Sequence, residues 1–360
     1  MTTKWQWLVL AALAGCSAPV VTPDAGAEVD AGLPGEVDAG VVAGVLLAPV
    51  WSSIAATPVA SGLWGSVLTF DPVGKRFILH GGNTYPAGAV INDTFSYDIA
   101  TNTWSPIATT GDTPPLRYCH CAAYLPAQRQ VLIVGGRDAN ANVNSAFTLS
   151  LETNTWQAVT GPTPTGAIGC NAHFLPRLGK ALVFGGDGPS GVNANTWSYD
   201  PATRVFTQLM PTTNAPARRD AMAAYDPIQE RYLLYGGAER IRSTYLDDVA
   251  FFDGMRWFVP TPPRPRPSPR RYGASGYTTP LSRWVIFGGT NDTDDFGDLW
   301  LIDPIASTFE RLDFTGGPSA RGFAASGIDE DTGRLFVFGG LNVVGFSAYA
   351  DSWVLRFDRR

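Results

Sequence analysis

Four arginines recur at one position in the sequence, and cations repeated in this way could bind an anionic ligand. Each lies eighteen residues before a pair of glycines: Arg117, Arg218, Arg270 and Arg321. Glu239 and Arg240 follow the fourth glycine pair. Arginine binds carboxylates through paired hydrogen bonds, so this set predicts a site for an anion such as a sugar acid. The alternative is structural: each arginine binds backbone carbonyls of the neighbouring unit.

Other clusters point to less specific chemistry. Asp292, Asp294, Asp295 and Asp298 crowd one stretch and could bind calcium, but the spacing lacks the EF-hand pattern and we expect a solvated acidic loop. The chain contains no Gly-x-Ser-x-Gly, no zinc-type histidine motif and no phosphate loop. We therefore expect neither a metal nor a cofactor.

Three cysteines fall in two neighbouring units and could form a disulfide in an exported protein. If Cys170 faces the side of the strand that carries Cys119 and Cys121, a bridge to either one can form. The other arrangement would bring His120 to face His173. The sequence leaves open whether Cys170 pairs with Cys119 or with Cys121.

The element that must position these side chains is a repeat of about fifty residues. Glycine pairs follow apolar runs in "FILHGG", "VLIVGG", "ALVFGG", "YLLYGG", "WVIFGG" and "LFVFGG". Their first glycines lie 54, 50, 51, 52 and 51 residues apart. Each unit reads as four short strands, with an acidic exit after the third strand and an aromatic residue in the fourth, as in "TWSPI" and "TWQAV".

This pattern resembles the kelch repeat, in which a double glycine ends the second strand and a tryptophan stands about twenty residues further on. The resemblance covers residues 49–360 and implies an all-β, six-bladed β-propeller, which we place at residues 45–360. The sixth unit stops at its third strand in "DSWVLRFDRR", whereas "VWSSI" (Val50 to Ile54) has the form of a fourth strand. We expect the N-terminal strand to complete the last blade and close the ring.

The first residues predict export rather than fold. Residues 1–15 read as a signal peptide ending in "LAG", and the cysteine that follows, Cys16, matches the lipidation box of bacterial lipoproteins. Residues 16–44 carry carboxylates, Ala, Gly and Pro with no cation and no aromatic, as expected of a disordered tether. We expect an exported cell-envelope lipoprotein held to a membrane by lipid on Cys16.

The variable loops after the glycine pairs should share one face with the segments that precede the first strands, and variable loops on a rigid scaffold are where binding is usually built. We expect a monomeric scaffold that recognises a protein or a glycan through this loop face. A net charge of −6 argues against nucleic acid. The alternative is a carbohydrate-modifying enzyme of the sialic acid mutarotase type, another exported six-bladed kelch family, which predicts a deep pocket with convergent Arg and Glu at the channel mouth.

Overall fold

The computed structural model describes residues 41–42, 45–54, 57–59, 61–240, 244–261 and 263–359. The signal peptide, Cys16 and nearly all of the tether predicted for residues 16–44 lie outside these residues. In the described part, no helix is long and apolar enough to cross a membrane.

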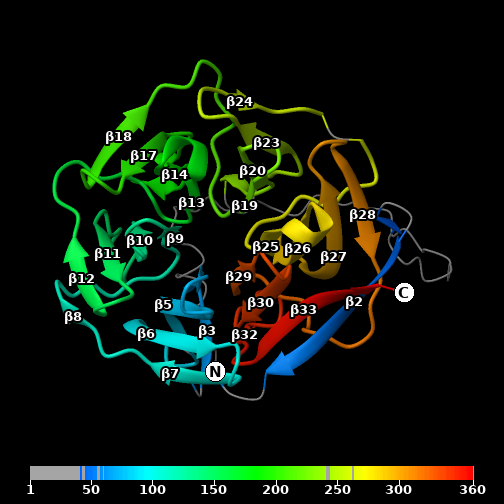
Figure 1. The fold of residues 1–360 in the computed structure, drawn as a ribbon, viewed down its shortest axis with the longest axis horizontal. Helices are drawn as coiled ribbons and strands as arrows, with labels where there is room; N and C mark the ends of the chain where they lie inside the picture. The colour runs from blue at the N-terminus through cyan, green and yellow to red at the C-terminus, as the bar shows by residue number, and fades with distance from the viewer. Residues whose placement is uncertain are drawn as a thin grey trace, which may run out of the picture.

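Six antiparallel sheets stand around a common axis as the blades of a propeller, which confirms the predicted fold (Figure 1). From the axis outward, blade 1 consists of β4 (Val67–Asp71), β5 (Arg76–Tyr85), β6 (Val90–Asp98) and β7 (Thr103–Pro106). Blade 2 consists of β9 (Cys121–Leu125), β10 (Gln130–Val134), β11 (Ala146–Ser150) and β12 (Thr155–Ala158). Blade 3 consists of β13 (Asn171–Leu175), β14 (Lys180–Phe184), β17 (Thr196–Asp200) and β18 (Val205–Leu209). Blade 4 consists of β19 (Met222–Asp226), β20 (Arg231–Tyr235), β23 (Val249–Phe252) and β24 (Trp257–Phe258). Blade 5 consists of β25 (Ala274–Thr278), β26 (Arg283–Thr290), β27 (Asp295–Asp303) and β28 (Thr308–Leu312). Blade 6 consists of β29 (Ala325–Asp329), β30 (Arg334–Phe338), β33 (Ser352–Arg359) and β2 (Val45–Ile54).

Short strands, small hairpins and 3-10 turns extend or connect the main strands of the blades. Residue pairs or triplets extend blades 6, 1 and 2 as β1 (Val41–Val42), β3 (Gly62–Trp64) and β8 (Thr110–Gly111). The loops after three glycine pairs fold into small hairpins: β15 (Asp187–Gly188) with β16 (Gly191–Val192), β21 (Ala238–Arg240) with β22 (Thr244–Tyr245), and β31 (Leu341–Asn342) with β32 (Ser347–Ala348). Two 3-10 turns, η1 (Pro176–Leu178) and η2 (Thr279–Leu281), join first and second strands.

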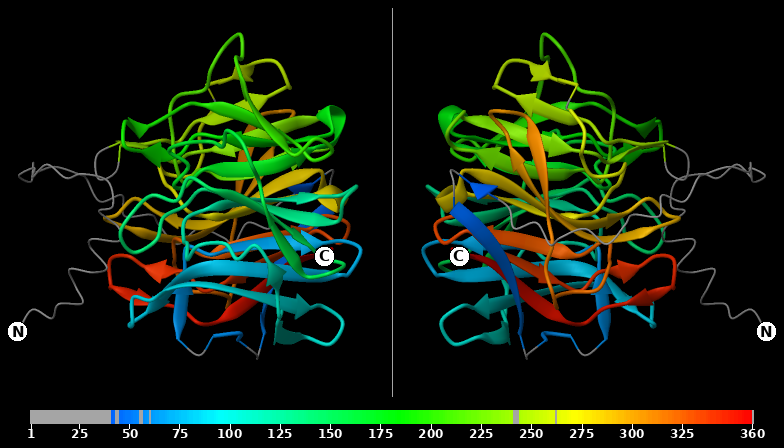
Figure 2. Two further views of the ribbon diagram at one scale, coloured as in Figure 1. Left: turned by 90° about the vertical axis from the view of Figure 1, so that its left-hand side faces the viewer. Right: turned by 90° about the vertical axis from the view of Figure 1, so that its right-hand side faces the viewer.

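The chain closes its own ring, as the sequence predicted. Strand β2 pairs antiparallel with β33 over eight residues, with Trp51 opposite Leu355. The two strands lie side by side although they come from opposite ends of the chain, blue beside red (Figures 1 and 2). Blade 6 therefore takes its outermost ladder strand from the N-terminal part, and closure leaves no gap between first and last blades.

The fourth-strand aromatic fills the gap between adjacent blades. In five blades its ring packs on the ring that precedes the glycine pair of the previous blade, with centroids 4.3–5.8 Å apart. The pairs are Trp104–Phe338, Trp156–His80, Trp257–Phe184, Phe309–Tyr235 and Trp51–Phe287. Edge-on and tilted ring contacts of this kind add to the stability gained by burying the rings.

The glycine pair is required where one blade meets the next. The first glycine of every pair has a positive φ, and a Cβ there would stand 2.2–2.8 Å from a backbone carbonyl of the following blade. The N–H of the second glycine donates to that same carbonyl at 2.8–3.1 Å in all six interfaces. Both reasons expected for glycine, left-handed backbone and close approach, therefore apply together.

Candidate functional site

The four recurrent arginines are buried clamps inside their blades. Arg117, Arg218, Arg270 and Arg321 are each at most 1% exposed. In every case Nη1 donates to the carbonyl of the first glycine of the same blade, at 2.9–3.1 Å. Nε donates to the carbonyl two residues earlier in the chain, at 2.9–3.2 Å. The guanidinium groups thus point into the protein and tie the start of each blade to its glycine pair.

Three of the clamps also hold a carboxylate that sequence reasoning missed. Arg218, Arg270 and Arg321 make bidentate contacts to aspartates: Asp248 and Asp351 just before the third strand of their blades, and Asp298 within the third strand β27. Burial alone would raise the pKa of Asp298, but Arg270 and the Trp300 indole N–H hold it below its usual value. The recurrence of Asp in three of the four units that carry the arginine was a signal available in the sequence.

Arg117 shows the clamp without its carboxylate. Its Nη2 donates to the hydroxyl of Ser145 at 3.0 Å and Nη1 donates to the Ser145 carbonyl. Burial lowers the pKa of Arg117 to about 10, because no carboxylate offsets the cost of desolvating the cation.

This geometry corrects the anion-site hypothesis for the four arginines. Their donors are turned toward protein acceptors and solvent does not reach them. The structural alternative fits better, with one change: the carbonyls bound by the side chains belong to the same blade rather than to the neighbour. The reason is topological, since the segment before a first strand and the end of the second strand of one sheet meet at the same end of that sheet. Glu239 and Arg240 differ, because both are exposed on β21 at the loop face.

A closed ring of backbone hydrogen bonds surrounds the axis just inside the loop face. One residue from each blade takes part, always with φ between 53° and 68°: Gly65, Cys119, Gly169, Asp220, Tyr272 and Phe323. The N–H of each donates to the carbonyl of its counterpart in the previous blade, at 2.7–3.2 Å, and Gly65 closes the circuit onto Phe323. We call these residues the axial ring. Left-handed backbone at four non-glycine residues could not be foreseen from their identities.

The loop-side end of the axis is filled rather than open. On one side Trp64 packs edge-on against Tyr118 and Phe323, with centroids 5.1 and 5.5 Å away, and Phe323 stacks on Tyr272 at 3.7 Å. These rings belong to one buried cluster. This aromatic plug packs side chains of blades 1, 2, 5 and 6 together.

On the other side a buried ionic network occupies the same depth. Arg219 donates to Asp187 at 3.0 Å and to Asp220 at 2.7 Å. Arg271 donates to Asp220 at 2.9 Å and to Asp292 at 2.6 Å, and the Tyr245 hydroxyl also donates to Asp292. Both arginines directly follow a clamp arginine, so the two Arg-Arg pairs were the sequence signal for this network.

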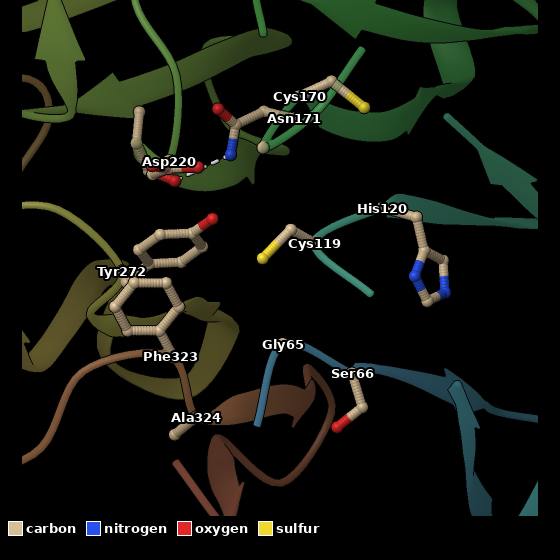
Figure 3. A pocket seen from close by; sticks show the side chains of 12 residues that line it. Gly65, Ser66, Cys119, His120, Cys170, Asn171, Asp220, Tyr272, Phe323 and Ala324 are labelled. Atoms are coloured by element: carbon tan, nitrogen blue, oxygen red, sulfur yellow. Dashed lines mark hydrogen bonds between the residues drawn. The ribbon is translucent and has the colours of Figure 1, made fainter. Parts of the chain in front are cut away.

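A cavity of about 130 Å³ lies on the axis beside the axial ring (Figure 3). All six blades contribute to its lining, and the side chains of Cys119, Asp220 and Tyr272 point toward one another across it. Buried polar lining atoms without a protein partner are Ser66 Oγ, both ring nitrogens of His120, Asn171 Oδ1 and Asp220 Oδ1. None of the six residues predicted to bind a ligand lines this cavity, so the convergent Arg and Glu expected of the mutarotase alternative are not found there.

The cysteine alternatives resolve in favour of one pair. Cys121 on β9 and Cys170 just before β13 form a disulfide that joins blades 2 and 3. Cys119 is a buried free thiol in the axial ring, and burial raises its pKa to about 11. His120 faces His80 of blade 1, with centroids 5.5 Å apart, rather than His173.

The acidic loop is less solvated than expected. Asp292 and Asp298 are held by Arg271 and Arg270. Asp294 accepts hydrogen bonds from Asn291 and Thr293 of its own loop. Within the ranges that the structure describes, no group of three His, Cys, Asp or Glu side chains could hold a metal ion.

The loop face carries accessible apolar side chains above blades 6, 1 and 2. Val344 at the β31–β32 tip is 53% exposed and Leu116, beside a clamp arginine, is 47% exposed. Half-buried Phe346 follows Val344 in the β31–β32 turn, and half-buried Tyr85 and Ile91 belong to the β5–β6 hairpin. The Tyr85 hydroxyl donates to the Phe346 carbonyl at 2.7 Å, and Ile91 accepts a backbone hydrogen bond from the residue after Leu116. We call these five residues the apolar stripe.

Comparison with known proteins agrees with this architecture. Residues 68–274 match the family described as the KLHDC2/KLHL20/DRC7 Kelch-repeats domain. The Rab9 effector protein with kelch motifs of Bos taurus is 31% identical over 180 residues, covering 47% of this chain and 48% of that protein. Kelch domain-containing protein 3 of Homo sapiens is 29% identical over 246 residues, covering 63% and 62%.

Coverage is uneven among relatives. Leucine-zipper-like transcriptional regulator 1 of Pongo abelii is 27% identical over 274 residues, which is 69% of this chain but 30% of that protein. The chain spans about half the length of the Rab9 effector proteins that it matches. Because the family match covers more than half of the chain and the glycine pairs, blades and closure are all in place, the protein belongs to the Kelch-repeat family.

Proposed function

We propose that this propeller is a protein-binding scaffold and that it recognises its partner through the loop face. The observation that carries the proposal is the apolar stripe, which is accessible beside a mouth closed by packed rings and ion pairs. A filled mouth offers a broad surface rather than a substrate pocket, and accessible apolar side chains rimmed by polar loops are typical of protein interfaces.

The relatives support a protein partner as the class of ligand. One is named as an effector of Rab9, which is a relation to another protein. Fold likeness by itself does not transfer a partner. The identity of the partner here is therefore left to the surface chemistry of this chain.

Paired substitutions on the two faces test the proposal. Leu116→Ser and Val344→Ser alter the apolar stripe, whereas Val73→Ser alters a 66% exposed valine in the β4–β5 turn on the opposite face. A polypeptide cross-linked to the wild-type protein in its native envelope should be lost with both stripe variants and retained with Val73→Ser. Retention with the stripe variants and loss with Val73→Ser would place recognition on the other face.

A glycan could occupy the same face, and the same experiment separates it. Enzymatic removal of envelope glycans before cross-linking should leave capture unchanged if the partner surface is protein. Loss of capture after this treatment would replace the protein partner by a glycan.

Size-exclusion chromatography with light scattering should give the mass of one chain, as expected for a monomer.

We further propose that lipid on Cys16 holds the propeller at a cell-envelope membrane, on the periplasmic side or at the cell surface, with residues 16–44 as the spacer. The support is the "LAGC" box at the end of the apolar leader and the tether composition. Metabolic labelling with a fatty acid should mark the wild-type protein and not Cys16→Ser. Equal labelling of the two proteins would contradict the anchor. So would a Cys16→Ser protein that stays on membranes in high salt as the wild-type protein does.

A further inference from the structure

The cavity on the propeller axis has a polar lining that recognition through the loop face does not use. All six axial-ring residues line it, together with residues that follow them by one or two positions. Its volume of about 130 Å³ is below the range of about 300–1,000 Å³ that is usual for small-molecule pockets. The same volume has room for about four water molecules, at about 30 Å³ each.

Asp220 is the charged group of this lining, and one of its oxygens lacks a donor. Oδ2 accepts hydrogen bonds from Arg219 at 2.7 Å and from Arg271 at 2.9 Å. Oδ1 has no hydrogen-bond partner among the described residues, although Asp220 is only 3% exposed. A buried acceptor without a donor costs about 1–3 kcal/mol, and more when it is charged. We therefore expect a donor from outside the protein at Oδ1.

Neutral polar groups of other blades line the same space. Ser66 and His120 are buried, and neither the Ser66 hydroxyl nor a ring nitrogen of His120 has a partner among the described residues. Asn171 Oδ1 is a further acceptor without a donor. Burial lowers the pKa of His120, so its neutral ring offers one donor and one acceptor.

A thiol and a phenol complete the lining on the side of Asp220. The side chains of Cys119 and Tyr272 point toward Asp220 across the cavity (Figure 3). Burial raises the pKa of Cys119 to about 11 and that of Tyr272 well above its usual value, so both groups stay protonated and neutral. The cavity is thus lined by one carboxylate and by groups that both donate and accept.

Water matches this lining better than other small occupants do. A water molecule donates two hydrogen bonds and accepts two, whereas an apolar guest would leave the lining groups without partners. A further cation at Asp220 would lie close to the guanidinium groups of Arg219 and Arg271, which already bind this carboxylate. Within the described residues, no group of three His, Cys, Asp or Glu side chains could hold a metal ion.

We propose that the axial cavity is a hydration site that holds a cluster of about four long-lived water molecules, one of which donates to Asp220 Oδ1. The cluster supplies the hydrogen bonds that the protein does not, and this allows a carboxylate to stay charged at the centre of the wheel. The site is independent of the partner that the loop face recognises.

Substitutions at Cys119 test the hydration site. Cys119→Met adds two carbon atoms to a side chain that points into the cavity, and they take the space of about two water molecules. Cys119→Ser removes the thiol equally but keeps a small polar group. Magnetic relaxation dispersion of water ²H and ¹⁷O counts the water molecules that tumble with the protein. The count should fall by about two in Cys119→Met and stay at the wild-type value in Cys119→Ser.

A second measurement uses the wild-type protein, so the test does not depend on how Cys119→Met folds. Cross-relaxation between water and the protons of Gly169, which lines the cavity, should have the sign of a long-lived contact. Absence of this contact, or equal water counts in folded Cys119→Met and Cys119→Ser, would overturn the proposal. An anomalous scattering peak beside Asp220 Oδ1 in crystals soaked in Rb⁺ would replace the water cluster by a cation site.

Discussion

The clamp formed by Arg270 and Asp298 gives the sharpest test of the role assigned to the recurrent arginines. Arg270→Met keeps an unbranched apolar stem and removes the charge and the donors of the side chain. It would strip Asp298 of its bidentate partner and leave the carbonyls of Ser268 and Gly288 without the donors they now have, at 2.9 and 3.1 Å. Because Asp298 is only 17% exposed, its unpaired charge is not well solvated.

Breaking a buried ion pair by removing one partner costs about 3–5 kcal/mol of unfolding free energy. Arg117→Met is the internal control, since Ser145 replaces the aspartate in that blade and no charge is left unpaired; hydrogen bonds to a charged donor suggest a smaller loss of about 1.5–3 kcal/mol. In the double variant Arg270→Met/Asp298→Asn, the loss should be at least 1 kcal/mol less than the sum of the two single losses, because the second substitution removes the stranded charge.

Urea unfolding followed by tryptophan fluorescence measures these losses through the midpoint and slope. Equal losses for Arg270→Met and Arg117→Met, or strictly additive losses in the double variant, would refute the clamp. So would partner binding abolished by Arg270→Met under conditions where the variant is fully folded, because that result would return the arginine to the ligand site.

Three further outcomes are expected. Trp51→Ala should cost about 3–5 kcal/mol, because it empties the contact that closes the ring, and a loss below 1 kcal/mol in urea unfolding would contradict closure. Burial lowers the pKa of His120 and lowers that of His80 to about 3, so the unfolded chain takes up protons below pH 6.5 that the folded chain refuses. Stability should fall as pH drops from 6.5 toward 3, by about 2 kcal/mol at pH 5 from His80 with His120 acting in the same direction, and a flat profile would count against their neutral burial. Cys121→Ser opens the bridge to Cys170 and should cost about 2–4 kcal/mol, read as a lower melting temperature that added reductant no longer changes.

The architecture could be predicted because the repeat marks it in residues with narrow physical uses. A glycine pair after an apolar run fits where backbone from the next blade approaches and φ is positive, and the fourth-strand aromatic fits where two sheets leave a gap. The last unit lacks a fourth strand, and the N-terminal "VWSSI" segment has the form of one, so the sequence predicted that this segment completes the last blade. All of these signals are local in the sequence, and they recur from one repeat to the next.

The candidate site could be predicted only in part, because its residues act across blades. The clamp was placed on the neighbouring blade, since a repeat reveals which position recurs and not which carbonyl it reaches. The axial ring holds Asp220, Tyr272 and Phe323 in left-handed backbone, and a closed circuit of hydrogen bonds between blades links them. The disulfide partner could not be predicted because Cys119 and Cys121 lie two residues apart and would share one side of a regular strand. Cys119 instead lies before β9, in the left-handed backbone of the axial ring, and Cys121 pairs with Cys170.

Hydrogen exchange of the protein with and without its captured partner tests the loop-face account most directly. We expect slower exchange in the hairpin of β31 and β32 and in the β5–β6 turn, and unchanged exchange in the β4–β5 turn on the opposite face. Protection confined to the turns of the opposite face, with the two loop-face hairpins unaffected, would contradict recognition through the apolar stripe.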